Sequence, residues 1–353
     1  MHRKCRRAII VCMSEENLYI NVKNRICDMI FNGTYQEGER IPSERILAET
    51  LDVSRVTVRK SLDLLESEHL IVREVGSGTR VCFHNYGTAS SMDMIVLIAP
   101  AKNPFFAEFI AHFQTYAEQE GSMLLYVEKP PTETLENCLY RLYKRGLQNT
   151  VIWLEDLPVD MEKLKRLRAL GMNMVFFDTD KGLPFADCVA LDNDEAVRTL
   201  CGELQKEGCR DIRYAGWDRR DIYSIACREA ACLKETGEEV PFLHLPWECR
   251  HNVSEFVLNY LRSYNKPLPD AIVCGDREIA AAVSYSVRRL KAVQTKVAGI
   301  DDFPEAGRRQ VVTYRQNLEE SVKQIFYCLA MQNQKQIEWK AALCKVEGTL
   351  TCY

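Results

Sequence analysis

The sequence predicts an α/β protein in two parts: a small N-terminal module of helices and a β-hairpin, then a larger body of doubly wound parallel sheets. In residues 41–81, two helical patterns, each preceded by a serine, lead into a glycine-tipped hairpin. From Asp93 onward, short apolar runs alternate with amphipathic segments. Such alternation is typical of parallel sheets covered by helices on both faces.

The N-terminal module is expected to begin with a helix at residues 18–31, which Gly33 ends. Ser43 and Ser54 are placed to cap two further helices, because a serine hydroxyl accepts an N–H of the first helical turn. Only residues 51–53 separate these helices, which indicates a helix-turn-helix. The outer face of the second helix carries basic and hydroxyl side chains: Arg55, Thr57, Arg59 and Lys60.

This outer face suits the major groove of DNA, where arginines and hydroxyls at a helix end reach base edges. The hairpin tip Gly76-Ser77-Gly78, between strands expected at residues 70–72 and 80–83, suits a close approach to phosphates. Alternatively, Arg55 and Arg59 only keep a helix face solvated. The joint occurrence of capped turn, basic face and hairpin favours a winged helix-turn-helix.

The segment "IPSER…LAETLDVSRVTVRKSLDLLE…VREVGSGTRV" resembles the GntR family of bacterial transcription regulators over roughly residues 18–83. It has that family's Pro-Ser-Glu-Arg entry, Val-Ser-Arg-x-Thr-Val-Arg recognition helix and Gly-x-Gly-Thr wing. Ser77 stands where the wing often has a basic residue, and Arg80 where an aromatic is common. The resemblance implies operator DNA contacts by Arg45, Ser54, Arg55, Thr57, Arg59, Gly76, Ser77 and Gly78.

Composition and charge are those of an ordinary globular protein, with 46% hydrophobic and 27% charged residues. Residues 1–86 contain 13 Lys and Arg against 12 Asp and Glu, so positive charge for DNA has to gather on one face. The 15 cysteines form no Cys-x-x-Cys pair, which suits a reducing, cytoplasmic location. Residues 1–17 are interpreted as a basic extension, since the apolar run at 8–13 is too short for a signal peptide. No run is long enough to span a membrane.

Residues 84–92 are small and polar, as expected of a linker, and residues 93–353 are expected to form the body. Its length suits two lobes. The expected strands are residues 95–99, 123–127, 150–154, 173–177, 189–191, 212–215, 271–274 and 297–300.

The body resembles the sugar-binding domain of LacI-type regulators and periplasmic binding proteins over roughly residues 94–351. The nearest matches are "NPFF" at 103–106, Asp192-Asn193 and "GIDD" at 299–302. A GntR-type module on such a body is similar to the arabinose-repressor subgroup. The resemblance implies a two-lobed, periplasmic-binding-protein-like fold and a sugar-like effector between the lobes. It also implies a homodimer on a pseudo-palindromic operator.

Acidic and amide side chains follow several expected strands, where ligands bind in doubly wound sheets. Asn103, Asp178, Asp276 and Asp301 are therefore expected to accept hydrogen bonds from a polyol. Phe105 lies off the apolar stripe of its helix and is expected to stack on a sugar ring. Helix capping by the aspartates, and a core position for Phe105, remain open alternatives.

The family usually has an arginine opening a helix of the second lobe, where this sequence has Ile225. Arg219 and Arg220, a few residues earlier, are expected to replace it as effector ligands.

Other chemistry has little support. His244, Cys249 and His251 lack the partner set of a metal site, and no cofactor motif is present. The sequence predicts a non-enzymatic regulator, expected to repress a carbohydrate-utilisation operon. Two alternatives stay open: a body that only dimerises, and a DNA-binding module fused to an enzyme domain.

Overall fold

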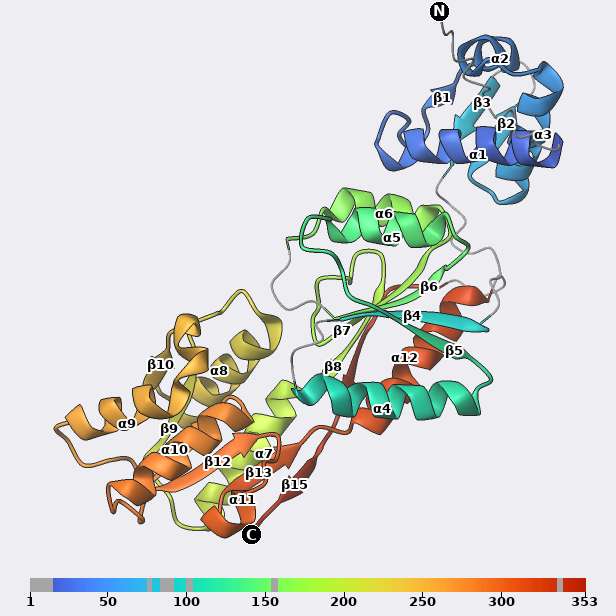
Figure 1. Ribbon diagram of the computed structural model, residues 1–353. Coiled ribbons are helices and arrows are strands. Elements are labelled where there is room, and N and C mark those ends of the chain that lie inside the picture. Colours follow the sequence, from blue (N-terminus) through green and yellow to red (C-terminus); the bar gives the residue numbers. More distant parts are fainter. Residues whose placement is uncertain (1–14, 75–77, 83–91, 100–103, 154–157, 335–338) are drawn as a thin grey trace, which may run out of the picture.

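The computed structural model describes residues 15–74, 78–82, 92–99, 104–153, 158–334 and 339–353. The molecule has three parts: an N-terminal head and two α/β lobes that form the body (Figure 1). The basic extension up to residue 14, the wing tip at 75–77 and the linker at 84–91 lie outside the described residues. Among the described residues, no helix is long and apolar enough to cross a membrane.

The head is a winged helix-turn-helix. Its elements are α1 (Glu15–Phe31), β1 (Arg40–Ile41), α2 (Glu44–Leu51), α3 (Arg55–Ser67), β2 (Ile71–Glu74) and β3 (Gly78–Val81). The sheet has the order β1-β3-β2, and Ile71 pairs with Val81 so that both buried side chains face the helices. The wing strands therefore lie one or two residues away from their expected positions.

Both predicted helix caps are confirmed. The Ser43 hydroxyl accepts the backbone N–H of Ile46 at 3.5 Å, and the Ser54 hydroxyl accepts that of Thr57 at 3.1 Å. Asp52, at φ 54°, adopts the left-handed conformation that ends α2 and makes the turn compact. The helix α1 begins at Glu15, three residues before the expected start. Acidic side chains in a first turn favour that earlier start.

Lobe 1 is a six-stranded parallel sheet of order β14-β8-β7-β6-β4-β5. Helices α5 and α6 pack on one face and α4 and α12 on the other. The strands are β4 (Met94–Ile98), β5 (Met123–Val127), β6 (Asn149–Trp153), β7 (Asn173–Phe177), β8 (Asp187–Leu191) and β14 (Leu343–Val346). The helices are α4 (Pro104–Gln119), α5 (Leu135–Tyr143), α6 (Met161–Ala169) and α12 (Leu318–Asn333).

Lobe 2 is a second six-stranded sheet, β10-β9-β11-β12-β13-β15, parallel except for β15 at its edge. Helices α7 and α8 cover one face, and α9 and α10 the other. The strands are β9 (Ile212–Trp217), β10 (Leu243–Leu245), β11 (Ala271–Cys274), β12 (Lys296–Ile300), β13 (Val312–Arg315) and β15 (Thr349–Thr351). The helices are α7 (Asn193–Lys206), α8 (Tyr223–Thr236), η1 (Trp247–His251), α9 (Val253–Ser263), α10 (Arg277–Arg289) and α11 (Ala306–Arg309).

The chain crosses between the lobes three times: from β8 to α7, from β13 to α12, and from β14 to β15. Each crossing takes only one to a few residues, so the lobes are joined by short hinge segments. Parallel strands bring their carboxyl ends to one edge, and ligands of such sheets bind beyond that edge. The fold therefore places the expected ligand site in the space between the lobes.

Candidate functional site

The arginines among the predicted DNA contacts lie on the exposed face of α2 and α3. Arg55 is exposed, and the Arg59 side chain is 63% exposed. Arg59 forms an ion pair with Glu44 of α2, Nη2 to Oε2 at 2.8 Å, which lowers the pKa of Glu44. Arg45 pairs with Glu49 at 3.0 Å. These exposed pairs are weak, so DNA phosphates can replace the carboxylates.

Ser54 and Thr57 take part in the cap of α3. Their hydroxyl oxygens lie 2.8 Å apart, and the Thr57 backbone N–H points at Ser54. Gly78 opens β3 at φ 88°, a left-handed conformation that glycine adopts without strain. Gly76 and Ser77, predicted at the wing tip, lie outside the described residues.

Sequence reasoning missed two residues beside these. Arg73 of β2 donates to the carbonyl oxygen of Arg59 at 3.4 Å and pairs with Asp63 at 2.8 Å, so the wing supports the recognition helix. Val56, beside Arg55, is 63% exposed. An apolar side chain at this end of a recognition helix can contact a thymine methyl group. In the sequence, the signal for Val56 was an apolar residue in an otherwise basic first turn of the helix.

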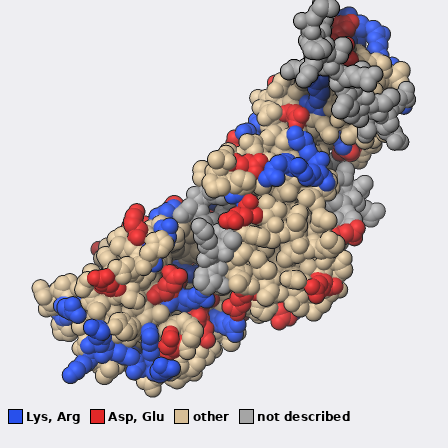
Figure 2. All heavy atoms as spheres, viewed as in Figure 1, with Lys and Arg blue, Asp and Glu red and all other residues tan. Residues whose placement is uncertain are grey.

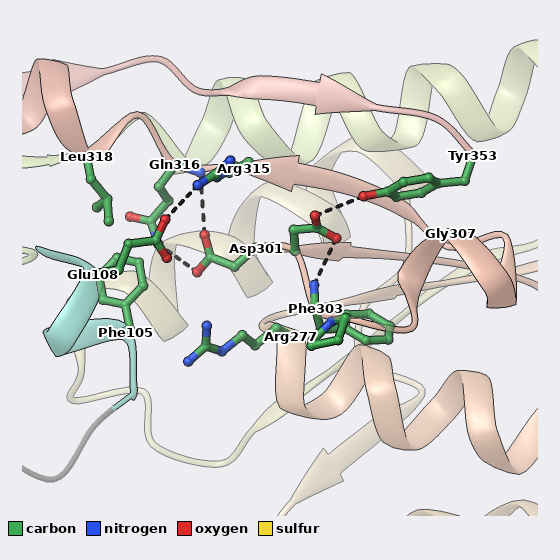
Figure 3. Close-up of a pocket in the computed structure, with 12 residues that line it drawn as sticks. Phe105, Glu108, Arg277, Asp301, Phe303, Gly307, Arg315, Gln316, Leu318 and Tyr353 are labelled. Carbon is green, nitrogen blue, oxygen red and sulfur yellow. Dashed lines mark hydrogen bonds and ion pairs between the residues drawn. The ribbon is translucent and has the colours of Figure 1, made fainter.

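A cavity of about 400 Å³ lies between the lobes (Figure 3). Lobe 1 contributes Phe105, Glu108 and Leu318. The lobe 2 side carries mainly polar and charged side chains: Arg277, Asp301, Asp302, Arg315, Gln316 and Tyr353. This volume lies in the range of small-molecule pockets.

Two of the residues predicted to bind an effector, Phe105 and Asp301, line this cavity. The Phe105 ring is half-buried and meets the edge of Trp153, with centroids 5.5 Å apart. Asp301, at φ 65°, accepts the Gln316 side-chain amide at 2.9 Å. Burial raises the pKa of Asp301. Asn103 lies outside the described residues.

Charge is unevenly partnered around the cavity. Glu108 of lobe 1 pairs with Arg315 of lobe 2 at 2.6 Å, and Asp302 accepts the Tyr353 hydroxyl at 2.8 Å. The Arg277 side chain extends toward Phe105, below Asp301 in Figure 3. It has no hydrogen-bond partner among the described residues, which leaves its donors available to a ligand.

Asp178 lies where the lobes meet. One carboxylate oxygen accepts the Ser224 hydroxyl of α8, in lobe 2, at 3.2 Å. The other, Oδ1, is buried with no hydrogen-bond partner within the described parts of the chain. Burial raises the pKa of Asp178 to about 6, against the opposing effects of Arg228 and Ser224. A buried acceptor without a donor is a costly arrangement that a ligand hydroxyl would relieve.

Arg228 was not among the predicted residues. It is buried on α8 and donates to the Asn193 side chain at 2.7 Å and to the Gly275 carbonyl oxygen at 2.8 Å. Its charge opposes the rise that burial causes in the pKa of both Asp178 and Asp301. In the sequence, the signal for Arg228 was its position one helical turn after Ile225, which stands where the family usually has an arginine.

The remaining predicted effector residues have partners of their own. Asp276 caps α10, accepting the Ile279 N–H at 2.8 Å, and also accepts the Trp217 indole N–H. The capping alternative therefore describes its local structure. Arg219 pairs with Asp221 at 2.6 Å, and Arg220 pairs with the buried Glu229. Like Asp178, these three residues do not line the cavity described above.

Comparison with known proteins separates the two parts of the chain. Residues 18–81 match the family of bacterial regulatory proteins, gntR family. The head is a GntR-type domain. A relative, the probable fructoselysine utilization operon transcriptional repressor of Escherichia coli K12, is 40% identical over 68 residues. That match covers 19% of this chain and 28% of the relative, so the chain spans less than a third of the relative's length.

The body resembles solved structures of another kind. An ABC transporter solute-binding protein from Burkholderia graminis, in complex with D-arabinose, aligns with a TM-score of 0.63 at 16% identity. The alignment covers 75% of this chain and 96% of that one. The lac repressor dimer bound to operator and an anti-inducer aligns with a TM-score of 0.59 at 16% identity. This alignment covers 74% of this chain and 93% of that one. The body therefore has the LacI and periplasmic-binding-protein fold predicted from the sequence.

Proposed function

We propose that this protein is a sequence-specific DNA-binding transcription regulator that represses a carbohydrate-utilisation operon. A small sugar or sugar derivative, bound between the lobes, would control it. One observation carries the proposal: a cavity lined from both lobes belongs to the same chain as an exposed, basic recognition helix. A ligand that touches both lobes can shift the equilibrium between their arrangements, and only by its differential affinity for them.

On the DNA side, Arg55, Arg59 and Arg45 would make the principal contacts, with Thr57 and Ser54 fixing the helix end. The Gly76–Gly78 tip would approach the phosphate backbone. The exposure of the α3 arginines and the GntR-type match of residues 18–81 support this assignment. Arg59 would exchange Glu44 for a base or phosphate on binding.

On the effector side, Phe105 would stack on the apolar face of a sugar ring, and Asp301 and Asp178 would accept its hydroxyl donors. Asn103 belongs to the same proposed set on sequence grounds, and Asp276, Arg219 and Arg220 would act around its edge. The free donors of Arg277 favour an effector with an acceptor-rich group at that end, such as a sugar acid or sugar phosphate.

A homodimer in the cytoplasm, bound to a pseudo-palindromic operator, completes the proposal. Two heads related by a two-fold axis need two half-sites. The likeness of the body to a repressor solved as a dimer on its operator supports this arrangement. No catalytic role is proposed. A body that only dimerises is the competing function.

Operator titration by fluorescence anisotropy, with and without a panel of sugars and sugar derivatives, tests the proposal. One compound is expected to change operator affinity, by roughly 5–150-fold for a coupling of about 1–3 kcal/mol. The same compound at a hundred times its dissociation constant should stabilise the protein by roughly 2.7 kcal/mol. Sequence-specific binding with no response to any compound would favour the body that only dimerises.

Arg55→Ala provides the matching test of the head. Loss of a bidentate base contact should cost about 1–3 kcal/mol of specific affinity and relax base preference at one position. Arg80→Ala, which changes a wing-strand residue that donates to the Gly38 carbonyl oxygen, is the control. Unchanged affinity of the Arg55 variant for the native promoter would remove this residue from the interface.

A further inference from the structure

The head is joined to the body by more than the linker, because its helix α1 also contacts lobe 1. The Phe31 ring, at the end of α1, stacks on the Tyr140 ring of α5 with centroids 4.1 Å apart and planes inclined by 6°. Phe31 is only 3% exposed. Buried side chains of the head and of the α5–α6 face of lobe 1 form one continuous hydrophobic cluster. Such continuity is a property of packed domains rather than of modules joined by a tether.

Polar contacts give this interface a defined geometry. The Tyr140 hydroxyl donates to Oδ1 of Asp28 at 2.6 Å, and Lys144 lies 3.3 Å from the same oxygen. Burial and the Asp28 carboxylate raise the pKa of Tyr140, so the phenol stays protonated and donates. Burial likewise raises the pKa of Cys27, on the adjacent position of α1, to about 12.

Lobe 1 also completes the end of α1. The last turn of this helix has no basic residue of its own. Arg166 of α6 donates to the Phe31 carbonyl oxygen at 3.4 Å, and Lys163 lies 5.8 Å from the centre of the Phe31 ring. A cation at a helix C-terminus satisfies orphan carbonyls and opposes the helix dipole. Figure 2 shows Lys and Arg side chains gathered on the part of lobe 1 next to the head.

Gly33 fits the same contact. It has φ 77°, and a Cβ atom at this position would lie 3.0 Å from the Arg166 guanidinium. The turn after α1 is therefore both left-handed and closely covered by lobe 1.

We propose that the α5–α6 face of lobe 1 is a docking surface for the head, and that this contact carries lobe movement to the recognition helix. The path continues inside the head, where the Ser61 hydroxyl of α3 donates to the Tyr19 carbonyl oxygen of α1 at 2.7 Å. Helix α1 thus touches lobe 1 at one end and α3 along its length. The docking stands on the contacts alone, whereas its role in effector response rests on the proposed function.

A double-mutant cycle in the full-length protein tests the docking. Asp28→Ala and Tyr140→Phe are each expected to lower the thermal midpoint, and the double variant to lose no more than the worse single variant. Asp28→Ala combined with Glu162→Ala, on the exposed side of α6, is the control and should be additive. Additive loss in the Asp28–Tyr140 pair would show that the head is not docked in solution.

A second measurement tests the coupling. Tyr140→Ala with Arg166→Gln should leave effector affinity unchanged but reduce the effector-induced change in operator affinity to less than half of its wild-type factor. A full effector response in this variant would overturn the coupling route. If the wild type itself shows no effector response, the proposed function and the coupling both fail, while the cycle still decides the docking. A preserved cycle and a reduced response together support both parts.

Discussion

Asp178→Asn is expected to stabilise the protein at neutral pH while weakening effector binding. Asparagine keeps the shape of the side chain, tolerates the left-handed φ of 56°, and can still accept the Ser224 hydroxyl. It removes the charge and replaces one acceptor oxygen with an NH2 donor, so that one acceptor for an effector hydroxyl is lost. The exchange therefore separates the electrostatic cost of Asp178 from its packing.

The size of the expected gain in stability follows from the raised pKa of Asp178. Burial moves the pKa of Asp178 from 3.8 to about 6, with Arg228 opposing the rise. The contribution of this group to stability is therefore complete below pH 3.8 and is lost as the pH rises through about 6. At about 1.4 kcal/mol per pH unit between the two values, ionised Asp178 costs about 3 kcal/mol at neutral pH. The corresponding gain in thermal midpoint for the variant is roughly 6–12 °C for a body of this size.

Thermal unfolding of wild type and variant by circular dichroism, from pH 4 to pH 8, measures this. The difference in midpoint should be small near pH 4, grow up to about pH 6 and then stay level. Asp270→Asn is the matched control, because Asp270 accepts the backbone N–H groups of Arg210 and Asp211, which lower its pKa. That variant should be less stable than wild type. An Asp178 variant no more stable than wild type at pH 8 would refute the reasoning.

Three further changes have defined outcomes. Arg277→Gln should weaken effector binding by about 1.5–3 kcal/mol in calorimetry, because a charged donor in the cavity is lost, with operator affinity unchanged. Val56→Ala should reduce discrimination for one A·T pair in a binding-site selection experiment, and unchanged selection would exclude a thymine contact. Ser54→Ala should lower head stability by about 1 kcal/mol in urea unfolding, whereas Ser67→Ala, near the other end of α3, should change it less.

Sequence reasoning succeeded where the signal was local. The Ser43 and Ser54 caps depend on residues three positions away, and the strands at 123–127, 173–177 and 271–274 are apolar runs with their own boundaries. These strands of the body could therefore be predicted one by one.

It failed where pairing partners are distant or the segment is short. Strands β10, β13, β14 and β15 have three or four residues each and owe their conformation to neighbouring strands. Residues 312–315 were not among the expected strands, although they pair with β12 and β15. Arg228 was missed because its role depends on Asn193 and Gly275, 35 and 47 residues away. The docking of Asp28 on Tyr140, 112 residues apart, has no local signal at all.

The docked head restricts how an effector can act. If the head moves with lobe 1, closure of the lobes changes the spacing of two heads only when something other than lobe 1 holds the partners together. A dimer fixed solely through lobe 1 would keep the two heads at constant spacing. Changes in the interlobe contacts Glu108–Arg315 and Asp178–Ser224 would then not alter DNA binding. Effector control therefore requires lobe 2 to contribute to the dimer contact. Each lobe 1, with its docked head, can then move relative to the two lobes 2 that hold the dimer together.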